Sequence, residues 1–335
     1  MEYRSVLEVC KVSSPADVLL GLGFVSRNWV KACESDELWY SLLDSRGYSS
    51  HPDVSFSPKT WFAHLNYRSC CIPLIRKDHF ALFFCRKAQW CPLVLLRVPI
   101  QADQVSASTV LPDGSLLCCG GGNWRTETSW DSAYRLQSDG SMTQLQSLCQ
   151  AREAHGILCF LDSVYVFGGD TDAGPPVLSG ERLILGDMTT LPGRTWSLLR
   201  NMRFGHSYFT PAVYKGLVYL CGGYSNTSEV FNPADEVFSV VRMRLTDPEH
   251  CWEVVQGDNL IIVSGYKMHV FAGPEGRQRI HREPGYTRDE YSSVPPVLVG
   301  NVAYRLLMNG DVLETDLETR EEVTLKKPRM RRRPQ

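Results

Sequence analysis

The feature of this chain that most limits its fold is an apolar strand ending in glycine, which recurs along the sequence. The runs end near residues 85, 122, 169, 223, 265 and 310, and they are HFALFFC, GSLLCCGGG, DSVYVFGG, GLVYLCGG, DNLIIVSG and GNVAYRLLMNG. Strands spaced roughly 40 to 50 residues apart are typical of one structural unit repeated along a chain. Such units bury their faces against their neighbours, so the chain is predicted to fold as an array.

Further strands flank each glycine-ended strand. An apolar run precedes it, as in HSYFTPAVYK, and a hairpin with its own turn residues follows it, as in EVFNPADEVFSVV. Four strands per repeat make one blade of a β-propeller. The sequence therefore predicts an all-β propeller over residues 70–325, with six blades expected and five or seven as alternatives. The first run, CIPLIRKDHFALFFCRKAQWCPLVLLRV, is either a divergent blade or a cap.

The glycine pairs are predicted to be structural. Gly121–Gly122, Gly168–Gly169 and Gly222–Gly223 are expected to end strands near the propeller axis, where a side chain would collide or force an unfavourable φ. The segments Arg152-x-x-His155 and Arg203-x-x-His206 occupy equivalent positions before the next strand. Residues that recur between repeats often brace loops, so both histidines are expected to belong to the scaffold.

Residues 1–66 have a helical pattern, unlike the rest of the chain. Ser14 caps a helix that has Pro15 at its first position. Apolar residues then follow at roughly helical spacing from Val18 to Val25. The predicted domains are a helical module over 1–45, a linker with a connecting helix over 46–69, the propeller, and a basic disordered tail over 326–335.

The segment PADVLLGLGFVSRNWVKACESDELWYSLL resembles the second half of an F-box, through its proline, leucine-rich helix, V-S-R-x-W and following L-W. In that family the module docks on a Skp-type adaptor, which bridges to a cullin–RING ubiquitin ligase. The resemblance implies adaptor contacts, which fall on Pro15, Leu19, Leu22 and Val25. It also implies a small bundle core, which falls on Trp29, Leu38 and Trp39. Without the resemblance, these helices would be interpreted as a cap on the propeller.

The repeats resemble the kelch family, through W-x-L-L…M-R-x-G-H-S at 196–207 and the paired glycines. In an antiparallel blade the connections after the second and fourth strands emerge on one face. The long loops lie there, and rigidly held loops are where recognition residues concentrate. The expected substrate-binding residues on this face are the aromatics and arginines that anchor protein interfaces, namely Trp124, Arg125, Trp130, Arg152, Arg203, Tyr224 and Tyr266. Converging arginines would suit an acidic or phosphorylated segment.

The net charge, the hydropathy pattern and the cysteine placement limit the classes of partner and the location that we expect. A net charge of −2 does not suit a general binder of nucleic acid. No apolar run approaches the ~20 residues of a membrane span, so no membrane partner is expected. The 12 cysteines lie largely in apolar runs without zinc-type spacing, and no signal peptide is recognised, which favours a reducing cytoplasmic location. The basic residues of 326–335 allow a nuclear localisation signal as well.

The sequence contains no catalytic motif, and no cofactor or metal is expected. The function implied by both resemblances is a non-enzymatic substrate-recognition subunit of a Skp–cullin–F-box ligase. A kelch scaffold, for instance on the cytoskeleton, is the alternative. A metal-dependent propeller oxidase would need converging ligands. His155, His206 and His250 are at equivalent positions, but repeat scaffolding explains them more simply.

Overall fold

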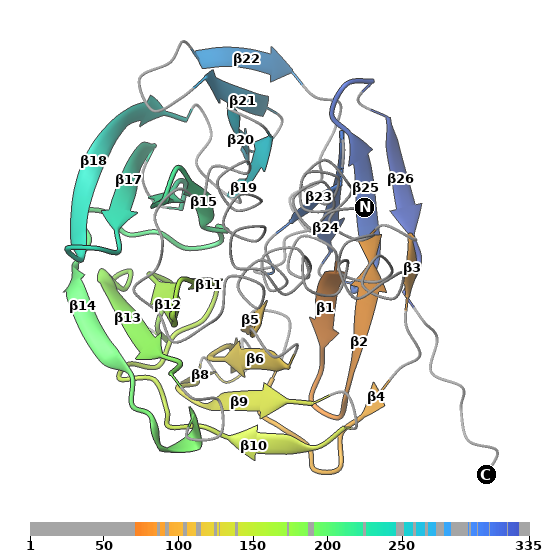
Figure 1. The fold of residues 1–335 in the computed structure, drawn as a ribbon, viewed down its shortest axis with the longest axis vertical. Coiled ribbons are helices and arrows are strands. Elements are labelled where there is room, and N and C mark those ends of the chain that lie inside the picture. The colour runs from red at the N-terminus through yellow and green to blue at the C-terminus, as the bar shows by residue number, and fades with distance from the viewer. Residues whose placement is uncertain are drawn as a thin grey trace, which may run out of the picture.

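The fold is a six-bladed β-propeller, seen in a computed structural model as a ring of sheets (Figure 1). The structure describes residues 71–327 with short gaps, and the gaps are 86–87, 91–93, 103–105, 112–114, 124–125, 127, 138–139, 173, 187–190, 224–225, 246–250, 257–258, 265–266, 273–277, 283–293, 295, 300, 308 and 320. The predicted helical module, the linker and the tail beyond residue 327 lie outside the described residues. The expected F-box positions are therefore not part of the structural description.

In the described residues the strands form six four-stranded antiparallel sheets and one small hairpin, β7–β8. Blade 1 contains β1 (Cys71–Ile75), β2 (His79–Phe84), β3 (Gln89–Trp90) and β4 (Val94–Leu95), and blade 2 contains β5 (Ala107–Val110), β6 (Leu116–Cys119), β9 (Ala133–Leu136) and β10 (Met142–Gln144), with β7 (Gly122–Asn123) and β8 (Thr128–Ser129) between β6 and β9. Blade 3 contains β11 (Gly156–Phe160), β12 (Ser163–Phe167), β13 (Ser179–Ile184) and β14 (Ser197–Asn201), and blade 4 contains β15 (Ala212–Tyr214), β16 (Leu217–Leu220), β17 (Thr227–Asn232) and β18 (Val237–Arg244). Blade 5 contains β19 (Cys251–Gln256), β20 (Asn259–Ser264), β21 (Lys267–Ala272) and β22 (Gln278–Arg282), and blade 6 contains β23 (Val297–Val299), β24 (Val302–Leu306), β25 (Val312–Asp316) and β26 (Glu322–Leu325). A short 3-10 turn, η3 (Leu191–Gly193), separates β13 from β14.

The first strand of each sheet lies nearest the centre of the ring. β5 packs on β1 and β11, and β19 packs on β15 and β23 (Figure 1). Inner strands are flanked by neighbouring blades on both faces, and β11 and β12 are accordingly buried at every residue. The outermost strand of the same blade, β14, exposes all its residues except Leu199. The apolar runs of the sequence are thus the strands held between blades.

The turn between the first two strands of blade 4 shows how local sequence fixes the register. Tyr214 pairs with Leu217, which leaves a two-residue turn of Lys215 and Gly216. Both have positive φ, at 49° and 78°. That combination gives the tight hairpin turn whose twist matches the flanking strands. The hairpin therefore sets which face of β15 and β16 meets each neighbouring blade.

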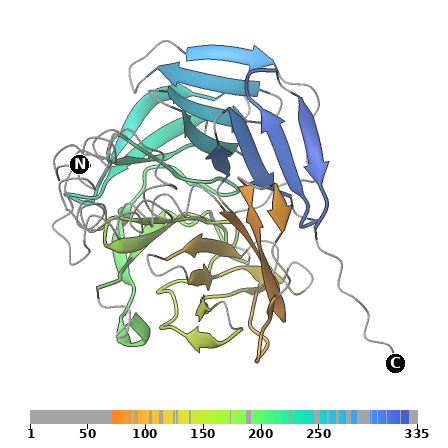
Figure 2. The ribbon, with the colours of Figure 1, turned by 45° about the vertical axis from the view of Figure 1, so that its right-hand side comes forward.

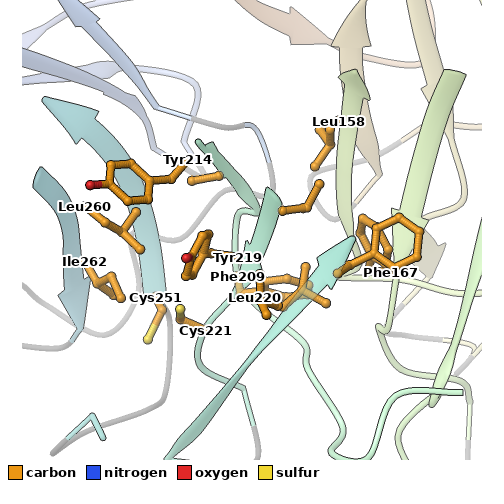
Figure 3. Close-up of a cluster of buried hydrophobic side chains, with 14 of the residues drawn as sticks. Leu158, Phe167, Phe209, Tyr214, Tyr219, Leu220, Cys221, Cys251, Leu260 and Ile262 are labelled. Carbon is orange, nitrogen blue, oxygen red and sulfur yellow. The ribbon is translucent and has the colours of Figure 1, made fainter. Parts of the chain in front are cut away.

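A large apolar cluster joins blades 3, 4 and 5. It includes Leu158 and Phe167 of blade 3, Tyr219 of blade 4, and Leu260 and Ile262 of blade 5 (Figure 3). The side chains come from facing sheets and fill the space between them. Because no single blade could bury this surface alone, the blades stabilise one another.

The ring closes between blade 6 and blade 1 by side-chain packing. In the described residues, β1–β4 pair only with one another, and so do β23–β26. The two sheets share a buried cluster with Ile72, Leu74 and Phe83 on one side and Tyr304 and Leu306 on the other. Figure 2 shows these two sheets side by side. No shared strand in the described part reinforces this seam.

The predicted propeller and its six blades are confirmed, and the run over residues 71–95 forms a blade. The glycine-ended strand is the second of its sheet in each blade, and it lies one strand away from the centre. That its glycines lie near the axis stays a prediction. What the paired glycines of blades 2, 3 and 4 approach are the loops that enter the innermost strands, as shown below.

Phe231 tests the packing between blades 3 and 4. It is fully buried on β17, and its ring centroid lies 5.5 Å from that of Tyr165 and 5.3 Å from that of Phe167, both on β12. Phe231→Ala should lower the free energy of unfolding by about 3–5 kcal/mol because it leaves a cavity between two blades. Denaturant unfolding measures this loss. Phe231→Leu, which keeps most of the volume, is the matched control, and equal losses for both variants would contradict the account.

Candidate interaction face

A pair of glycines ends the second strand of blades 2, 3 and 4. The pairs with positive φ are Gly120–Gly121, Gly168–Gly169 and Gly222–Gly223. A Cβ on Gly168 would overlap the carbonyl oxygen of His206. The glycines are therefore needed both for a left-handed backbone and for close approach to the loop that enters the next blade. In blade 2 the sequence prediction was shifted by one residue, because Gly122 already begins β7.

The carbonyl of the first glycine is bound within its own blade. It accepts a hydrogen bond from a residue in the loop that leads into the innermost strand. Ser106 Oγ donates to Gly120 O at 2.9 Å, Arg152 Nη1 donates to Gly168 O at 2.9 Å, and His206 Nδ1 lies 2.6 Å from Gly222 O. A serine, an arginine and a histidine thus bind the carbonyl of the first glycine at equivalent positions of three blades.

The amide of the second glycine is bound to the next blade. Gly121 N–H donates to Arg152 O at 2.9 Å, and Gly169 N–H donates to His206 O at 2.7 Å. Each entry loop is therefore held between the glycines of two consecutive blades. This fixes the backbone from which the loops of one face project.

Arg152 belongs to this bracing and not to the surface. Its side chain is fully buried, with Nη2 2.7 Å from Glu181 Oε1 on β13 and Nη1 also donating to Ser179 O. Glu181 additionally accepts the backbone N–H groups of Cys149 and Gln150. The prediction of Arg152 as a substrate-binding residue is wrong in this structure, because a partner could not reach its guanidinium group.

Arg203 holds the equivalent sequence position in blade 4 but points elsewhere. Its side chain is exposed, and its backbone N–H donates to Glu229 Oε1 at 3.0 Å. In this blade His206 takes the buried role, with Nε2 3.2 Å from Glu229 Oε2. The Arg203 side chain is therefore accessible, and its role in recognition stays a prediction.

The two acidic residues that receive the entry loops were missed at the level of sequence. Burial alone would raise the pKa of Glu229, but the hydrogen bonds from His206 and from the N–H groups of Arg203 and Phe204 bring that pKa below its ordinary value. Glu181 lies at the same place in blade 3. Both follow a serine by one or two residues on the third strand, in SGE and TSE, and this shared pattern could have revealed them.

The β7–β8 hairpin adds a projecting element beside Trp130. It is a separate two-stranded sheet inserted between the second and third strands of blade 2. Ser129 of β8 donates through both its N–H and its Oγ to Asp172 Oδ1 in the corresponding loop of blade 3, with 2.7 Å for the Oγ contact. Trp130 N–H donates to Gly121 O at 2.8 Å and leaves its side chain half-buried. The hairpin is thus fixed to two blades.

The remaining expected recognition residues lie outside the described residues. They are Trp124, Arg125, Tyr224 and Tyr266. By chain position Trp124 and Arg125 fall between β7 and β8, so the tethered hairpin carries them. The structure thus brings Trp130 and the β7–β8 hairpin together, and it separates Arg152 from the predicted group of arginines.

Burial shifts the pKa of several ionisable side chains in the described part. Burial raises the pKa of the Cys119 and Cys221 thiols well above 9.0, so neither is a ready nucleophile. Burial and the nearby Arg152 lower the pKa of His155 to about 3, so its ring is neutral. No group of three or more His, Cys, Asp or Glu side chains in the described residues could hold a metal ion.

Comparison with known proteins gives no family for this chain. No protein-family model matches it, and no curated protein matches it by sequence. In the described residues no helix is long and apolar enough to cross a membrane. The class of protein established here is therefore a six-bladed β-propeller, defined by its fold.

Replacement of the two equivalent arginines tests the difference between them. Arg152→Ala should cost about 3–5 kcal/mol of unfolding free energy because it leaves the Glu181 carboxylate buried without its charge partner. Arg203→Ala should change stability by less than about 0.5 kcal/mol because its side chain is exposed. Denaturant unfolding of both variants measures the contrast. Similar values for the two would show that the buried pair does not brace the loop.

Glu253 on β19 is a further buried acid in the bracing between blades 4 and 5. Cys221 N–H donates to its Oε1 at 2.8 Å, while its buried Oε2 has no hydrogen-bond partner in the described residues. Burial raises the pKa of Glu253 well above 4.5 even though the bonds from Cys221 oppose the rise. The folded protein therefore retains a proton that the unfolded chain releases.

A pH series tests this assignment. A raised folded pKa means that the contribution of Glu253 to stability is full below 4.5 and is lost as pH rises toward the folded value. Glu253→Gln removes that loss, so its unfolding free energy relative to the natural chain should increase from pH 4.5 toward neutrality. Glu229→Gln is the control with the opposite trend, because a lowered folded pKa contributes stability that is lost as pH falls. A pH-independent difference for Glu253→Gln in denaturant melts would refute the assignment.

Proposed function

We propose that this chain is the non-catalytic substrate-recognition subunit of a Skp–cullin–F-box ubiquitin ligase, with a kelch-type propeller that binds the substrate protein. The observation that carries the substrate-binding part is the β7–β8 hairpin. It is an insertion that the four-stranded blade does not need, and Asp172 ties it to the next blade. A tethered loop on a rigid scaffold loses little conformational entropy on binding.

The hairpin and the loop that enters blade 4 carry residue types that are typical of an interface. Trp130 is half-buried at its base, and Trp124 and Arg125 lie within the hairpin sequence. Arg203 is exposed on the loop that enters blade 4. Tryptophan and arginine are enriched among the residues that dominate protein–protein binding energy. These four residues form the proposed substrate face.

The bracing of the entry loops supports the kelch type. Arg152 and His206 occupy the repeated Arg-x-x-His segments and bind the carbonyl groups of paired glycines. This contact gives a physical reason for the spacing that the resemblance to kelch repeats rests on. Because the repeated residues brace the loops, the non-repeated residues would determine which substrate the propeller binds.

The adaptor-docking part rests on the resemblance of residues 5–45 to an F-box. In that resemblance Leu19 and Leu22 provide the contacting apolar surface. The ligase chemistry would then reside in other subunits, and this chain would require no cofactor. A propeller that serves as a scaffold for other proteins is the competing function, and it shares the substrate face but not the adaptor.

Co-purification with a Skp-type adaptor tests the docking part. The full chain should retain the adaptor, and Leu19→Asp combined with Leu22→Asp should abolish retention because charges cannot enter an apolar contact. The double variant should keep the unfolding transition of the propeller. Failure of the natural chain to retain any Skp-type adaptor would favour the scaffold function. Retention by the double variant would show that these leucines do not dock.

Affinity proteomics tests the substrate face. Trp124→Ala with Arg125→Ala should lose a specific set of bound proteins while adaptor retention is unchanged. Arg200→Ala, on the exposed outer strand β14, is the matched control and should lose none. An identical set of bound proteins for the natural chain and the double variant would exclude this face. Because the two experiments have separate readouts, either half of the proposal can fail alone.

A further inference from the structure

A second surface lies at the seam between blades 1 and 6. It begins at the β1–β2 turn, where Arg76 is half-exposed and Lys77 is exposed. Gly310, between β24 and β25, lies against the side chains of Arg76 and Lys327. A Cβ on Gly310 would be 3.0 Å from Lys327 Cδ and 3.4 Å from Arg76 Nη2. Lys326 is exposed beside it. Basic side chains from both ends of the described chain therefore meet at one place.

The end of β4 and the residues after it add an exposed arginine between two exposed aliphatic residues. Leu95 is 57% exposed and Val98 is 54% exposed, with the exposed Arg97 between them. Backbone bonds fix this segment to the β1–β2 turn, since Leu96 N–H donates to Asp78 O at 2.9 Å and Ile100 N–H donates to Lys77 O at 2.7 Å. The aliphatic and basic side chains thus belong to one rigid surface. We call it the seam surface, and it consists of Arg76, Lys77, Leu95, Arg97, Val98, Lys326 and Lys327.

We propose that the seam surface binds the anionic headgroups of a lipid bilayer. Peripheral attachment to membranes combines apolar side chains that enter the headgroup region with basic side chains that attract anionic lipid. Leu95 and Val98 supply the first part, and the surrounding cations supply the second. This contact is made at the membrane surface and needs no spanning helix.

The aliphatic pair favours a lipid surface over a nucleic acid. A phosphate backbone attracts cations but gives Leu95 and Val98 nothing to pack against. No aromatic side chain belongs to the seam surface, so it has no platform on which a base could stack. A lipid bilayer can contact both the aliphatic and the basic side chains of the seam surface.

Two acidic residues of the described part lie beside this surface. Asp78 lies 2.6 Å from His79 Nδ1, and Asp311 accepts from Lys326 Nζ at 3.0 Å and from the Lys327 N–H at 2.9 Å. Lys77 and Arg97 remain exposed beside these acids. Beyond Lys327 the sequence continues with Arg329, Arg331, Arg332 and Arg333, which add positive charge to the chain. The partial neutralisation predicts reversible binding that weakens as salt rises.

Vesicle co-sedimentation of the full chain tests the proposal. The chain should bind vesicles of phosphatidylcholine that contain phosphatidylserine, and it should bind pure phosphatidylcholine vesicles at least about tenfold more weakly, because several cations contribute at an anionic surface. Lys77→Ala with Arg97→Ala should weaken binding to the anionic vesicles about thirtyfold. Leu95→Ser with Val98→Ser should also weaken it, and the remaining binding should be more sensitive to salt.

Control variants separate a surface effect from general charge or folding. Arg200→Ala on β14 removes a cation on another outer strand and should leave vesicle binding unchanged. All the substituted side chains are exposed, so unfolding transitions should match that of the natural chain. Absence of binding to anionic vesicles would overturn the proposal. It would equally be overturned by unchanged binding in Lys77→Ala/Arg97→Ala, or by binding to a duplex DNA fragment without binding to vesicles.

Discussion

The structure depends on a contact in which a glycine pair of one blade holds the entry loop of the next. Gly169 binds His206 through the backbone, and the His206 ring reaches Gly222 in its own blade. The same connection runs from Gly121 through Arg152 to Gly168. Each loop is fixed at both ends, so consecutive blades are joined by directional bonds as well as by apolar packing. Without the small, left-handed glycines the loops could not approach closely enough to form these bonds.

The bracing of the entry loops buries charged side chains inside the propeller. Arg152 and Glu181 are both fully buried, and a buried pair of this kind gains little over apolar packing but is costly to break. Such pairs specify where a loop must lie more than they add to stability. In blade 4 a histidine replaces the arginine, and Arg203 is released to the surface. One repeat position is therefore buried in the scaffold in one blade and exposed in another.

The two surfaces proposed for binding differ in how they are built. The substrate face uses an inserted hairpin that a hydrogen bond to Asp172 holds in place. The seam surface uses side chains gathered where the ring closes, at a junction whose described residues share no strand.

The sequence by itself predicted the propeller and the second strand of each blade, and it favoured six blades over five or seven, because apolar strands and glycine turns repeat at near-regular spacing. It could not decide the fate of Arg152 and Arg203, which have the same local sequence. Their difference comes from the groups that surround them. Arg152 binds Glu181 and the carbonyl of Gly168. In blade 4 the equivalent acid and glycine carbonyl, those of Glu229 and Gly222, are bound by His206 and not by the side chain of Arg203. Nor could it show that residues near 77, 97 and 327 meet. Only tertiary structure brings distant segments together, because side-chain contacts across a closed ring leave no periodic trace in the chain.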